Sequence, residues 1–296
     1  MSICVMVKVP EGLVLAADSA ATVNASPVTE GGDPGPSGVL KVFFNATKVF
    51  QIRDLPVGVL TWGAGSFRAR TVASLVEEFE NEKDVQQINW SNLNVETLAS
   101  DFWRFMNARS EELLPKVPKD GRPKTGFVIC GYSGSEFFPE EYVAVVPTGS
   151  PRRLRPPNHN QPDFGANWFG STDAIVRLHH GRDDRLFDLL LQAGTPEKQL
   201  AQLKTRISQH LQYQVLFHSM PLGDAVDFAD FLVWTTIQRF RFVMGAELCG
   251  GPVDIATITR KDGFEWIRRK RRSSKWKMSR NRTHKPEHTE QHRTTT

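Results

Sequence analysis

Residues 1–23, MSICVMVKVPEGLVLAADSAATV, decide the fold because they hold two apolar runs separated by a tight turn. The first run, Ile3 to Val9, is interrupted only by Lys8, and the second occupies residues 13–17. Turn chemistry at residues 10–12 predicts a β-hairpin, which would set Asp18 opposite residues 2–4. Most chain ends are loosely held, so a terminus committed to a sheet suggests that it has a function.

The composition is typical of a globular protein, with 40% hydrophobic and 24% charged residues among 296. No run approaches the roughly 18 apolar residues of a membrane-spanning helix, and the first residues lack the pattern of a signal peptide. We therefore expect a cytoplasmic protein without a membrane segment. Three widely spaced cysteines, Cys4, Cys130 and Cys249, favour buried thiols over a disulfide framework or a zinc site.

Positive charge is concentrated at the end of the chain. Residues 268–296 hold eleven Lys or Arg against two Glu, a balance of +9 that leaves −5 for the remainder of a chain of net charge +4. This contrast predicts one folded domain over residues 2–267 and a disordered basic tail over 268–296. The tail could bind nucleic acid, but with one aromatic residue, Trp276, it does not favour a dedicated nucleic-acid function.

Hydrophobic periodicity predicts further elements along the chain. Polar, proline-rich stretches at 25–38 and 152–167 read as loops. The order of elements suggests stacked sheets between helical layers. The predicted strands are 39–44, 48–52, 57–62, 125–131, 142–146, 253–259 and 264–267, and the predicted helices are 67–80, 94–114, 172–192, 196–216 and 224–243.

Several common catalytic patterns are absent. The stretch GYSG at 131–134 lacks the spacing of a nucleophile elbow, and GAG at 63–65 is too short for a phosphate-binding fingerprint. His179 and His180 are neighbours on a predicted helix and point in different directions, so a surface position is favoured over a metal site. The N-terminus remains as the candidate reactive group.

A terminal hydroxyl residue can use its own α-amine as the base that activates it. The unperturbed pKa of an α-amine is about 7.7–8.0, and a nearby ammonium group lowers it because like charges repel. Such a site needs an N-terminal Ser, Thr or Cys, a lysine, a carboxylate that holds the lysine, and backbone N–H donors for an oxyanion.

Four stretches of the chain resemble the proteasome β-subunit family of N-terminal-nucleophile hydrolases. In family order they are EGLVLAADSAATV at 11–23, NATKVFQI at 45–52, VGVLTWGAGSF at 57–67 and GGPVDIATITRKDGF at 250–264. The matches span most of residues 2–266, although the middle helices match only in pattern. The resemblance implies a four-layer αββα sandwich, an α+β fold.

The resemblance also implies a set of site residues. Ser2 falls at the position of the terminal nucleophile once Met1 is removed, Asp18 and Lys48 match the ion pair, and Gly63 matches the oxyanion-hole glycine. Further matches are Ser171 at the terminal amine, Thr22 and Gly65 along the substrate backbone, and Thr61 near the pocket for the side chain that precedes the cut.

The chain departs from the family pattern at several positions. The nucleophile is Ser instead of Thr, and Ala246 and Cys249 stand where Asp and Ser are common, with Glu247 as a substitute if the register shifts by one. The long segment between Thr22 and Lys48 leaves Lys41 as an alternative partner of Asp18. Ser171 could also simply cap a helix.

The expected reaction is hydrolysis of peptide bonds, with no cofactor and no metal. The expected substrate is a peptide or unfolded protein, and the resemblance implies a homo-oligomer in a ring or related shell, with no unfoldase partner identified. Two alternatives stay open: a catalytically silent shell subunit, and an N-terminal-nucleophile amidase that acts on a small amide.

Overall fold

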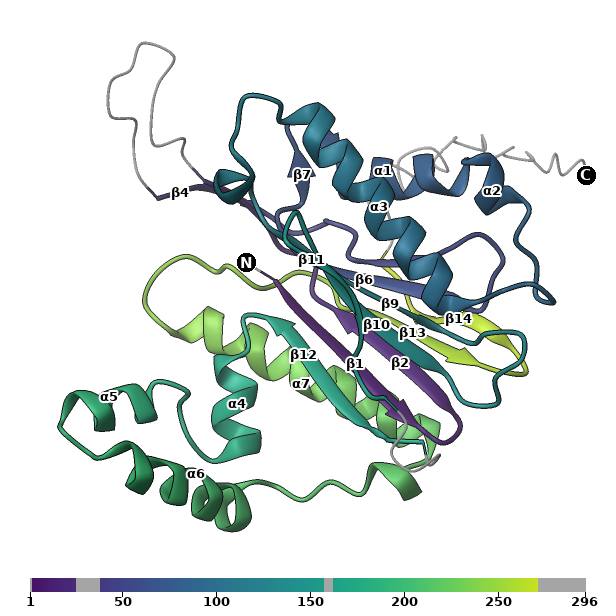
Figure 1. Ribbon diagram of the computed structural model, residues 1–296. Helices are drawn as coiled ribbons and strands as arrows, with labels where there is room; N and C mark the ends of the chain where they lie inside the picture. Colours follow the sequence, from purple (N-terminus) through teal and green to yellow (C-terminus); the bar gives the residue numbers. More distant parts are fainter. Residues whose placement is uncertain (1, 25–37, 157–161, 271–296) are drawn as a thin grey trace, which may run out of the picture.

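The computed structural model describes residues 2–24, 38–156 and 162–270. Two five-stranded antiparallel sheets form its centre (Figure 1). The first sheet has the order β12 (Gly165–Gly170), β1 (Ile3–Val9), β2 (Gly12–Ala17), β13 (Asp254–Thr259) and β14 (Gly263–Arg268). The second has the order β11 (Gly149–Arg153), β10 (Glu140–Val146), β9 (Thr125–Gly131), β6 (Val57–Gly63) and β5 (Val49–Gln51).

Burial on both faces explains why β1 is apolar at every position except Lys8. Ile3, Val5 and Val7 pack with helix α7 (Leu222–Phe242), whereas Cys4 and Met6 pack against the second sheet. Successive side chains of a strand point to opposite faces, so both faces of β1 are covered and all its residues are buried. The predicted hairpin is confirmed, with Cys4 opposite Ala17.

Lys8 interrupts the apolar run because it bridges the two sheets. Its Nζ lies 2.9 Å from Glu141 Oε2 on β10, and Arg155 contacts the other carboxylate oxygen at 3.1 Å. Burial raises the pKa of Glu141, and the two cations act in the opposite direction. The charged side chains are therefore a buried, fully paired link between the sheets.

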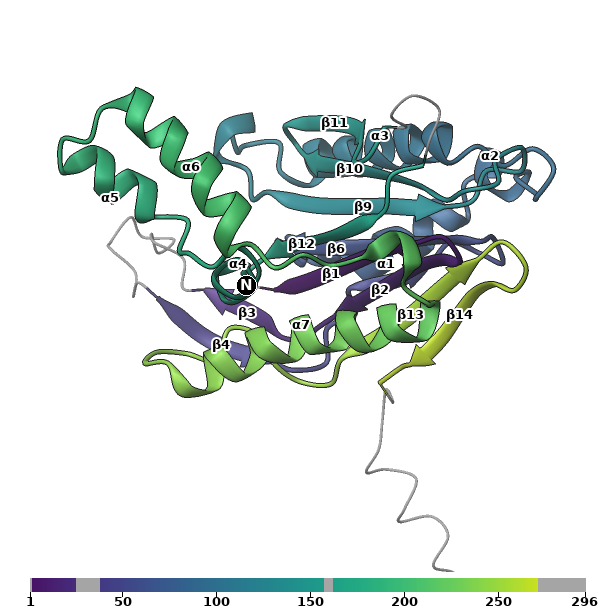
Figure 2. The same cartoon turned by 90° about the horizontal axis from the view of Figure 1, so that it is seen from below.

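Helices cover the outer face of each sheet (Figures 1 and 2). α1 (Val72–Glu80) and α3 (Val95–Leu113) pack on the second sheet, and α4 (Asp173–His180) and α7 pack on the first. The remaining helices are α2 (Lys83–Gln86), α5 (Leu186–Gln192) and α6 (Glu197–Leu211), with short 3₁₀ turns at Lys119–Gly121 and Phe217–Ser219. In the described ranges, no helix combines the length and hydropathy that crossing a bilayer requires.

Two short hairpins complete the described residues. β3 (Ala21–Asn24) pairs with β4 (Val39–Phe43), and β7 (Ser66–Phe67) pairs with β8 (Arg70–Thr71). The second hairpin corrects the predicted start of the helix at 67, because Thr71 caps α1 by accepting a hydrogen bond from Ser74 N. The predicted helix 172–192 is also wrong, since Gly181 in the left-handed region (φ 65°) separates α4 from α5.

The predicted loop at 152–167 is wrong at both ends, because β11 extends to Arg153 and β12 begins at Gly165. The predicted loop at 25–38 falls almost wholly outside the described residues. Of the predicted tail, only residues 268–270 are described, and Lys270 contacts Asp254 through both its backbone N–H and its ammonium. The rest of the tail, 271–296, lies outside the described ranges.

Candidate active site around Ser2

Ser2 lies at the start of β1, where β12 ends. Its carbonyl accepts a hydrogen bond of 2.7 Å from Ser171 N, and the neighbouring residue Ile3 pairs with Gly170. Gly170 has a φ of 93°, and a Cβ built there would lie 2.0 Å from Ser2 O. Only glycine fits this position, so Gly170 fixes the backbone of Ser2 although sequence analysis did not single it out.

Asp18 follows β2 and is held by donors from four segments. Its Oδ1 accepts from Ile3 N at 3.0 Å and from Lys48 Nζ at 2.5 Å. Its Oδ2 accepts from Ala20 N at 3.1 Å and from Gly250 N at 3.0 Å. The carboxylate is 1% exposed, so these donors replace water around a buried charge.

Lys48 lies just before β5 and is 5% exposed. Its carbonyl accepts from Thr61 N at 3.0 Å, which ties it to β6. Lys41, the alternative partner of Asp18, lies exposed on β4 opposite Val23. The geometry therefore pairs Asp18 with Lys48.

Cys249 lies against Ser171. The two side chains are hydrogen-bonded, and burial, followed by the negative charge of Asp18, raises the pKa of the Cys249 thiol to about 12. Ala246 and Glu247 lie in an exposed loop before it. Cys249, and not Glu247, thus supplies the side chain next to Ser171.

Cys4 and Thr61 are linked to the ion pair through Lys48, whose carbonyl accepts from Thr61 N. Cys4 Sγ donates to Thr61 O at 3.1 Å, and burial raises the pKa of this thiol as well. Thr61 is 5% exposed and its hydroxyl donates to Gly126 O at 3.2 Å. The sequence predicted Cys4 as a buried thiol, which is confirmed, but its neighbourhood of apolar strand residues gave no signal of a place beside the ion pair.

Gly63 ends β6 with a φ of 89°, and a Cβ there would lie 2.4 Å from Lys124 O. Its neighbour Trp62 stacks on Phe169, with ring centroids 4.3 Å apart. Because Phe169 precedes Gly170, this stack brings the end of β6 to the end of the sheet where Ser2 lies. The backbone alone demands glycine at 63, with or without an oxyanion.

Gly65 and Thr22 occupy the margins of this region. Gly65 is exposed, and its carbonyl accepts from Val72 N at 2.9 Å at the start of α1. Thr22 is half-buried on β3 and pairs with Val42. The structure thus bonds Ser2 to Ser171, Asp18 to Lys48, and Lys48 to Thr61. The N–H of Ile3, the residue after Ser2, joins the first pair to Asp18. The stack of Trp62 on Phe169 brings Gly63 to the same end of the sheets.

No group of three or more His, Cys, Asp or Glu residues that could hold a metal ion occurs in the described parts of the chain. His179 and His180 are half-buried and pack around Trp168, with ring centroids 5.1 and 5.9 Å from the indole. Burial lowers the pKa of both imidazoles. These histidines therefore act as packing groups at the end of α4.

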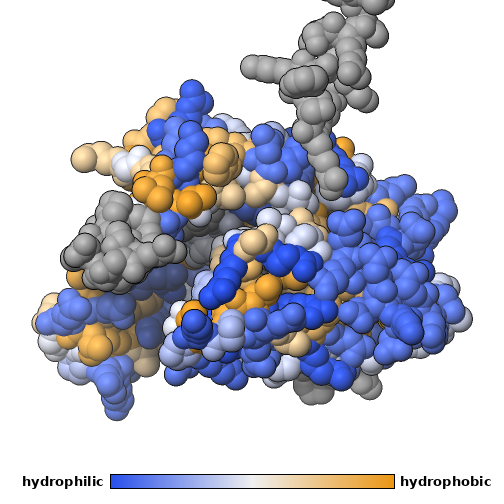
Figure 3. Space-filling view, turned by 90° about the horizontal axis from the view of Figure 1, so that it is seen from above, coloured by the Kyte–Doolittle hydropathy of each residue, from blue (hydrophilic) through white to orange (hydrophobic). Residues whose placement is uncertain are grey.

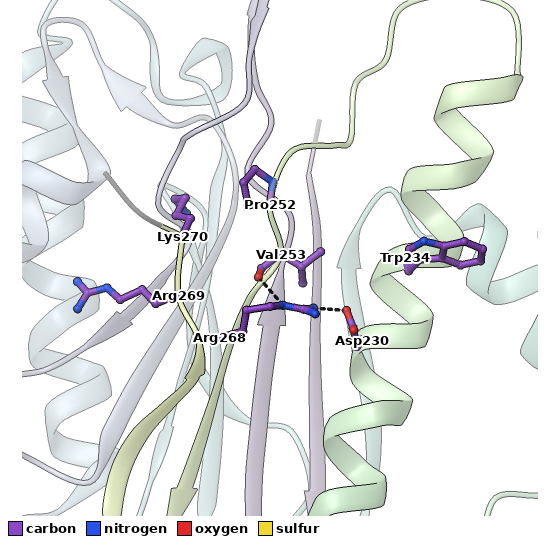
Figure 4. Close-up of a pocket in the computed structure, with 7 residues that line it drawn as sticks. All are labelled: Asp230, Trp234, Pro252, Val253, Arg268, Arg269 and Lys270. Atoms are coloured by element: carbon purple, nitrogen blue, oxygen red, sulfur yellow. Dashed lines mark hydrogen bonds and ion pairs between the residues drawn. The ribbon is translucent and has the colours of Figure 1, made fainter. Parts of the chain in front are cut away.

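Two cavities lie away from Ser2. One of about 380 Å³ lies between α7 and the end of β14, where Arg268 contacts Asp230 and the carbonyl of Val253 (Figure 4). Another of about 690 Å³ lies between α1, β5 and the residues after β14. Neither is lined by Ser2, Asp18 or Lys48.

Comparison with known proteins finds no matching family model and no significant match among curated proteins. Three similar solved structures are Anbu proteins. The Anbu (Gly-1) mutant from Hyphomicrobium sp. strain MC1 is 16% identical at a TM-score of 0.48, covering 93% of this chain and 88% of that one. Anbu (ancestral beta-subunit) from Yersinia bercovieri is 12% identical at a TM-score of 0.48, covering 90% of this chain and 87% of that one. The helical assembly of the Anbu complex from Pseudomonas aeruginosa is 16% identical at a TM-score of 0.51, covering 92% of this chain and 88% of that one.

These comparisons correct the family expected from the sequence. Assignment to the proteasome β-subunit family is wrong, because no family model matches the chain and the similar Pseudomonas aeruginosa structure is an Anbu complex. The chain has a mixed fold of helices and antiparallel sheets that is similar to the Anbu fold of the Pseudomonas aeruginosa protein.

Proposed function

We propose that the chain is an N-terminal-nucleophile hydrolase that cleaves peptide bonds with Ser2 after removal of Met1. The two sheets and their helical layers would then form the four-layer αββα sandwich of such enzymes. One observation carries the proposal: the buried ion pair of Asp18 and Lys48 is hydrogen-bonded to Ile3 N, the residue next to Ser2. An ion pair buried beside a chain terminus supplies the charge that activates a terminal amine.

The proposed reaction begins with attack of the Ser2 hydroxyl oxygen on a peptide carbonyl. The α-amine of Ser2 accepts the hydroxyl proton, and the ammonium of Lys48 favours the neutral amine. Gly63 N–H donates to the oxyanion of the tetrahedral intermediate. The proton passes to the leaving amine as the C–N bond breaks, and water then hydrolyses the acyl ester to regenerate Ser2.

Asp18 and Ser171 would hold the reacting groups in position. Asp18 orients Lys48, and Ser171 fixes the Ser2 backbone through its N–H. Thr22, Gly65 and Thr61 remain the proposed contacts for the substrate backbone and for the side chain before the cut. The chemistry proposed for Ser2 requires neither a cofactor nor a metal.

The enzyme would work in a self-assembled shell of identical chains, which admits unfolded polypeptides. The name of the Pseudomonas aeruginosa structure, a helical assembly, supports an assembly of this kind. Exposed apolar side chains also support it, and they occur in several patches (Figure 3). A folded domain over 2–267 with a separate basic tail over 268–296 remains part of the proposal, with no partner unfoldase assigned.

A catalytically silent shell subunit is the second candidate. Two observations favour it: Ser2 is only 5% exposed, and Cys249 stands beside Ser171 in place of a serine. A small-amide hydrolase has no observation in its favour beyond the shared chemistry.

The deciding experiment is the intact mass of the native protein before and after incubation with a peptide epoxyketone, whose double ring closure needs a hydroxyl and a free α-amine. Loss of the Met1 mass and one adduct per chain on Ser2, absent in Ser2→Ala, is the expected result. A retained Met1 contradicts the mechanism. Loss of Met1 without an adduct favours the silent subunit.

A further inference from the structure

Ser19 is fully buried and joins three segments around the ion pair. Its hydroxyl donates to Pro252 O at 2.6 Å, and its N–H donates to Gly250 O at 3.0 Å. Its own carbonyl accepts from Ala46 N at 2.9 Å. No pattern in the sequence singled out this residue.

Each of these segments carries a group that holds the ion pair. Gly250, whose carbonyl accepts from Ser19, donates its own N–H to Asp18 Oδ2 at 3.0 Å. Ala46 comes two residues before Lys48, so the same serine anchors the approach of the lysine. Ser19 is therefore bonded to the chain segments on both sides of the contact between Asp18 and Lys48.

The two partner segments also press against each other. Gly251 has a φ of 79°, and a Cβ there would lie 2.6 Å from Phe44 O. A Cβ at Gly250 would lie 3.0 Å from the Phe44 ring. Glycine backbone makes these contacts, and glycine restricts its own backbone dihedral angles less than any other residue. The hydrogen bond from the Ser19 hydroxyl to Pro252 O therefore supplies a restraint on the loop that the glycines do not.

We propose that Ser19 is a positioning residue whose hydroxyl sets the geometry of Asp18 and Lys48 by anchoring residues 249–252. This inference rests on the proposed hydrolase function. Without the hydroxyl, the Pro252 carbonyl loses its buried donor and the loop relaxes, which moves Gly250 N relative to Asp18. A displacement approaching 1 Å at a catalytic group costs up to about a hundredfold in rate.

The test compares Ser19→Ala and Ser19→Thr in the full chain, using hydrolysis of a fluorogenic peptide amide and crystal structures of each variant. Ser19→Ala is expected to lower kcat by about ten- to a hundredfold with KM unchanged, since substrate contacts are intact. Ser19→Thr keeps the hydroxyl and is expected to recover most of kcat. The crystal structure of Ser19→Ala is expected to show Lys48 Nζ displaced from Asp18 Oδ1.

Ser133→Ala is the matched control, because Ser133 is a buried serine whose hydroxyl accepts from Val95 N and contacts Glu140, away from Ser2. It is expected to lower stability without changing kcat. An unchanged kcat and an intact ion pair in Ser19→Ala would overturn the inference while leaving the hydrolase proposal in place. A wild-type protein without activity would overturn the hydrolase proposal, and the crystal structures would still decide whether Ser19 positions the ion pair.

Discussion

Lys48 Nζ lies 2.5 Å from Asp18 Oδ1 across thirty positions of sequence, and both side chains are buried. Two charges removed from water repay their desolvation only when their geometry is good and their other hydrogen-bonding sites are filled. Asp18 meets this condition through the N–H groups of Ile3, Ala20 and Gly250. The N-terminal end of β1 is therefore hydrogen-bonded to a buried ion pair whose carboxylate oxygens are both occupied by donors.

Removal of one partner should be costly. Lys48→Met leaves the Asp18 carboxylate buried without a cation, and we expect the free energy of unfolding to fall by about 3–5 kcal/mol. The double variant Asp18→Asn, Lys48→Met should lose less than the two single losses combined, because no uncompensated charge remains. Urea denaturation of all four proteins measures both effects, and additive losses would contradict a direct coupling.

Lys41 provides the matched comparison for activity. Lys41→Met should leave peptide hydrolysis within about twofold of wild type, because Lys41 lies exposed on β4. Lys48→Met should abolish hydrolysis at neutral pH, since the α-amine would lose the neighbouring ammonium. Initial rates of hydrolysis of one peptide amide compare the two variants. Equal losses of activity in Lys41→Met and Lys48→Met would exclude Lys48 as the activating lysine.

Gly170 should be intolerant of a side chain for two reasons, its positive φ and its close approach to Ser2 O. Gly194 has a similar φ of 88° but open space around its Cβ position, so Gly194→Ala isolates the cost of the backbone conformation. We expect about 1–2 kcal/mol for Gly194→Ala and a clearly larger loss for Gly170→Ala. Thermal or urea unfolding compares them, and equal losses would mean that the contact with Ser2 is relieved without cost.

The fold around β1 and β2 was predictable because periodicity and turn chemistry act locally. The hairpin register followed from the turn at residues 10–12, which predicts Asp18 opposite residues 2–4, and in the structure Asp18 N donates to Ile3 O. The choice between Lys41 and Lys48 was not local. It depends on how the segment after Thr22 returns to the sheet, which sequence spacing alone did not fix.

Other parts escaped prediction because tertiary contacts override local signals. β12 is a partner of β1, yet it follows a proline-rich polar stretch that reads as a loop. Glycine is required at position 170 because Ser2 O approaches it closely, and Ser19 bonds to the loop at residues 249–252. Neither requirement produces a periodic pattern in the sequence. The break between α4 and α5 depends on Gly181, whose left-handed conformation no hydrophobic periodicity signals.

Buried thiols should make the protein less stable at alkaline pH. Burial raises the pKa of Cys249 to about 12, above the usual value of a thiol, so the folded state retains a proton that the unfolded state loses. The contribution of the neutral thiol is fully present below pH 9 and is lost as pH rises towards 12, at about 1.4 kcal/mol per pH unit. Cys249→Ala should remove this thiol's share of the slope, which corresponds to one proton bound in the folded state and not in the unfolded state. Urea denaturation of the wild type and of Cys249→Ala between pH 8 and 11 measures how the free energy of unfolding depends on pH. The same slope in both proteins would show that the thiol is accessible to water.

The arm formed by α5 and α6 should carry a contact between copies of the chain. It projects from the sheets in Figures 1 and 2, and only Phe187 and Leu200 of its two helices are buried. Its exposed apolar residues are Leu189, Leu191, Leu203 and Leu211.

An exposed apolar surface of this kind marks an interface, so Leu189→Glu should reduce the assembled fraction. Phe137→Glu, at an exposed apolar residue outside the arm, is the control and should not change assembly. Sedimentation velocity of both variants and the wild type measures the sizes. Loss of assembly in Phe137→Glu but not in Leu189→Glu would move the interface away from the arm. A wild type that sediments as a monomer at every concentration would remove the shell from the proposed function while leaving the chemistry of Ser2 to be tested on its own.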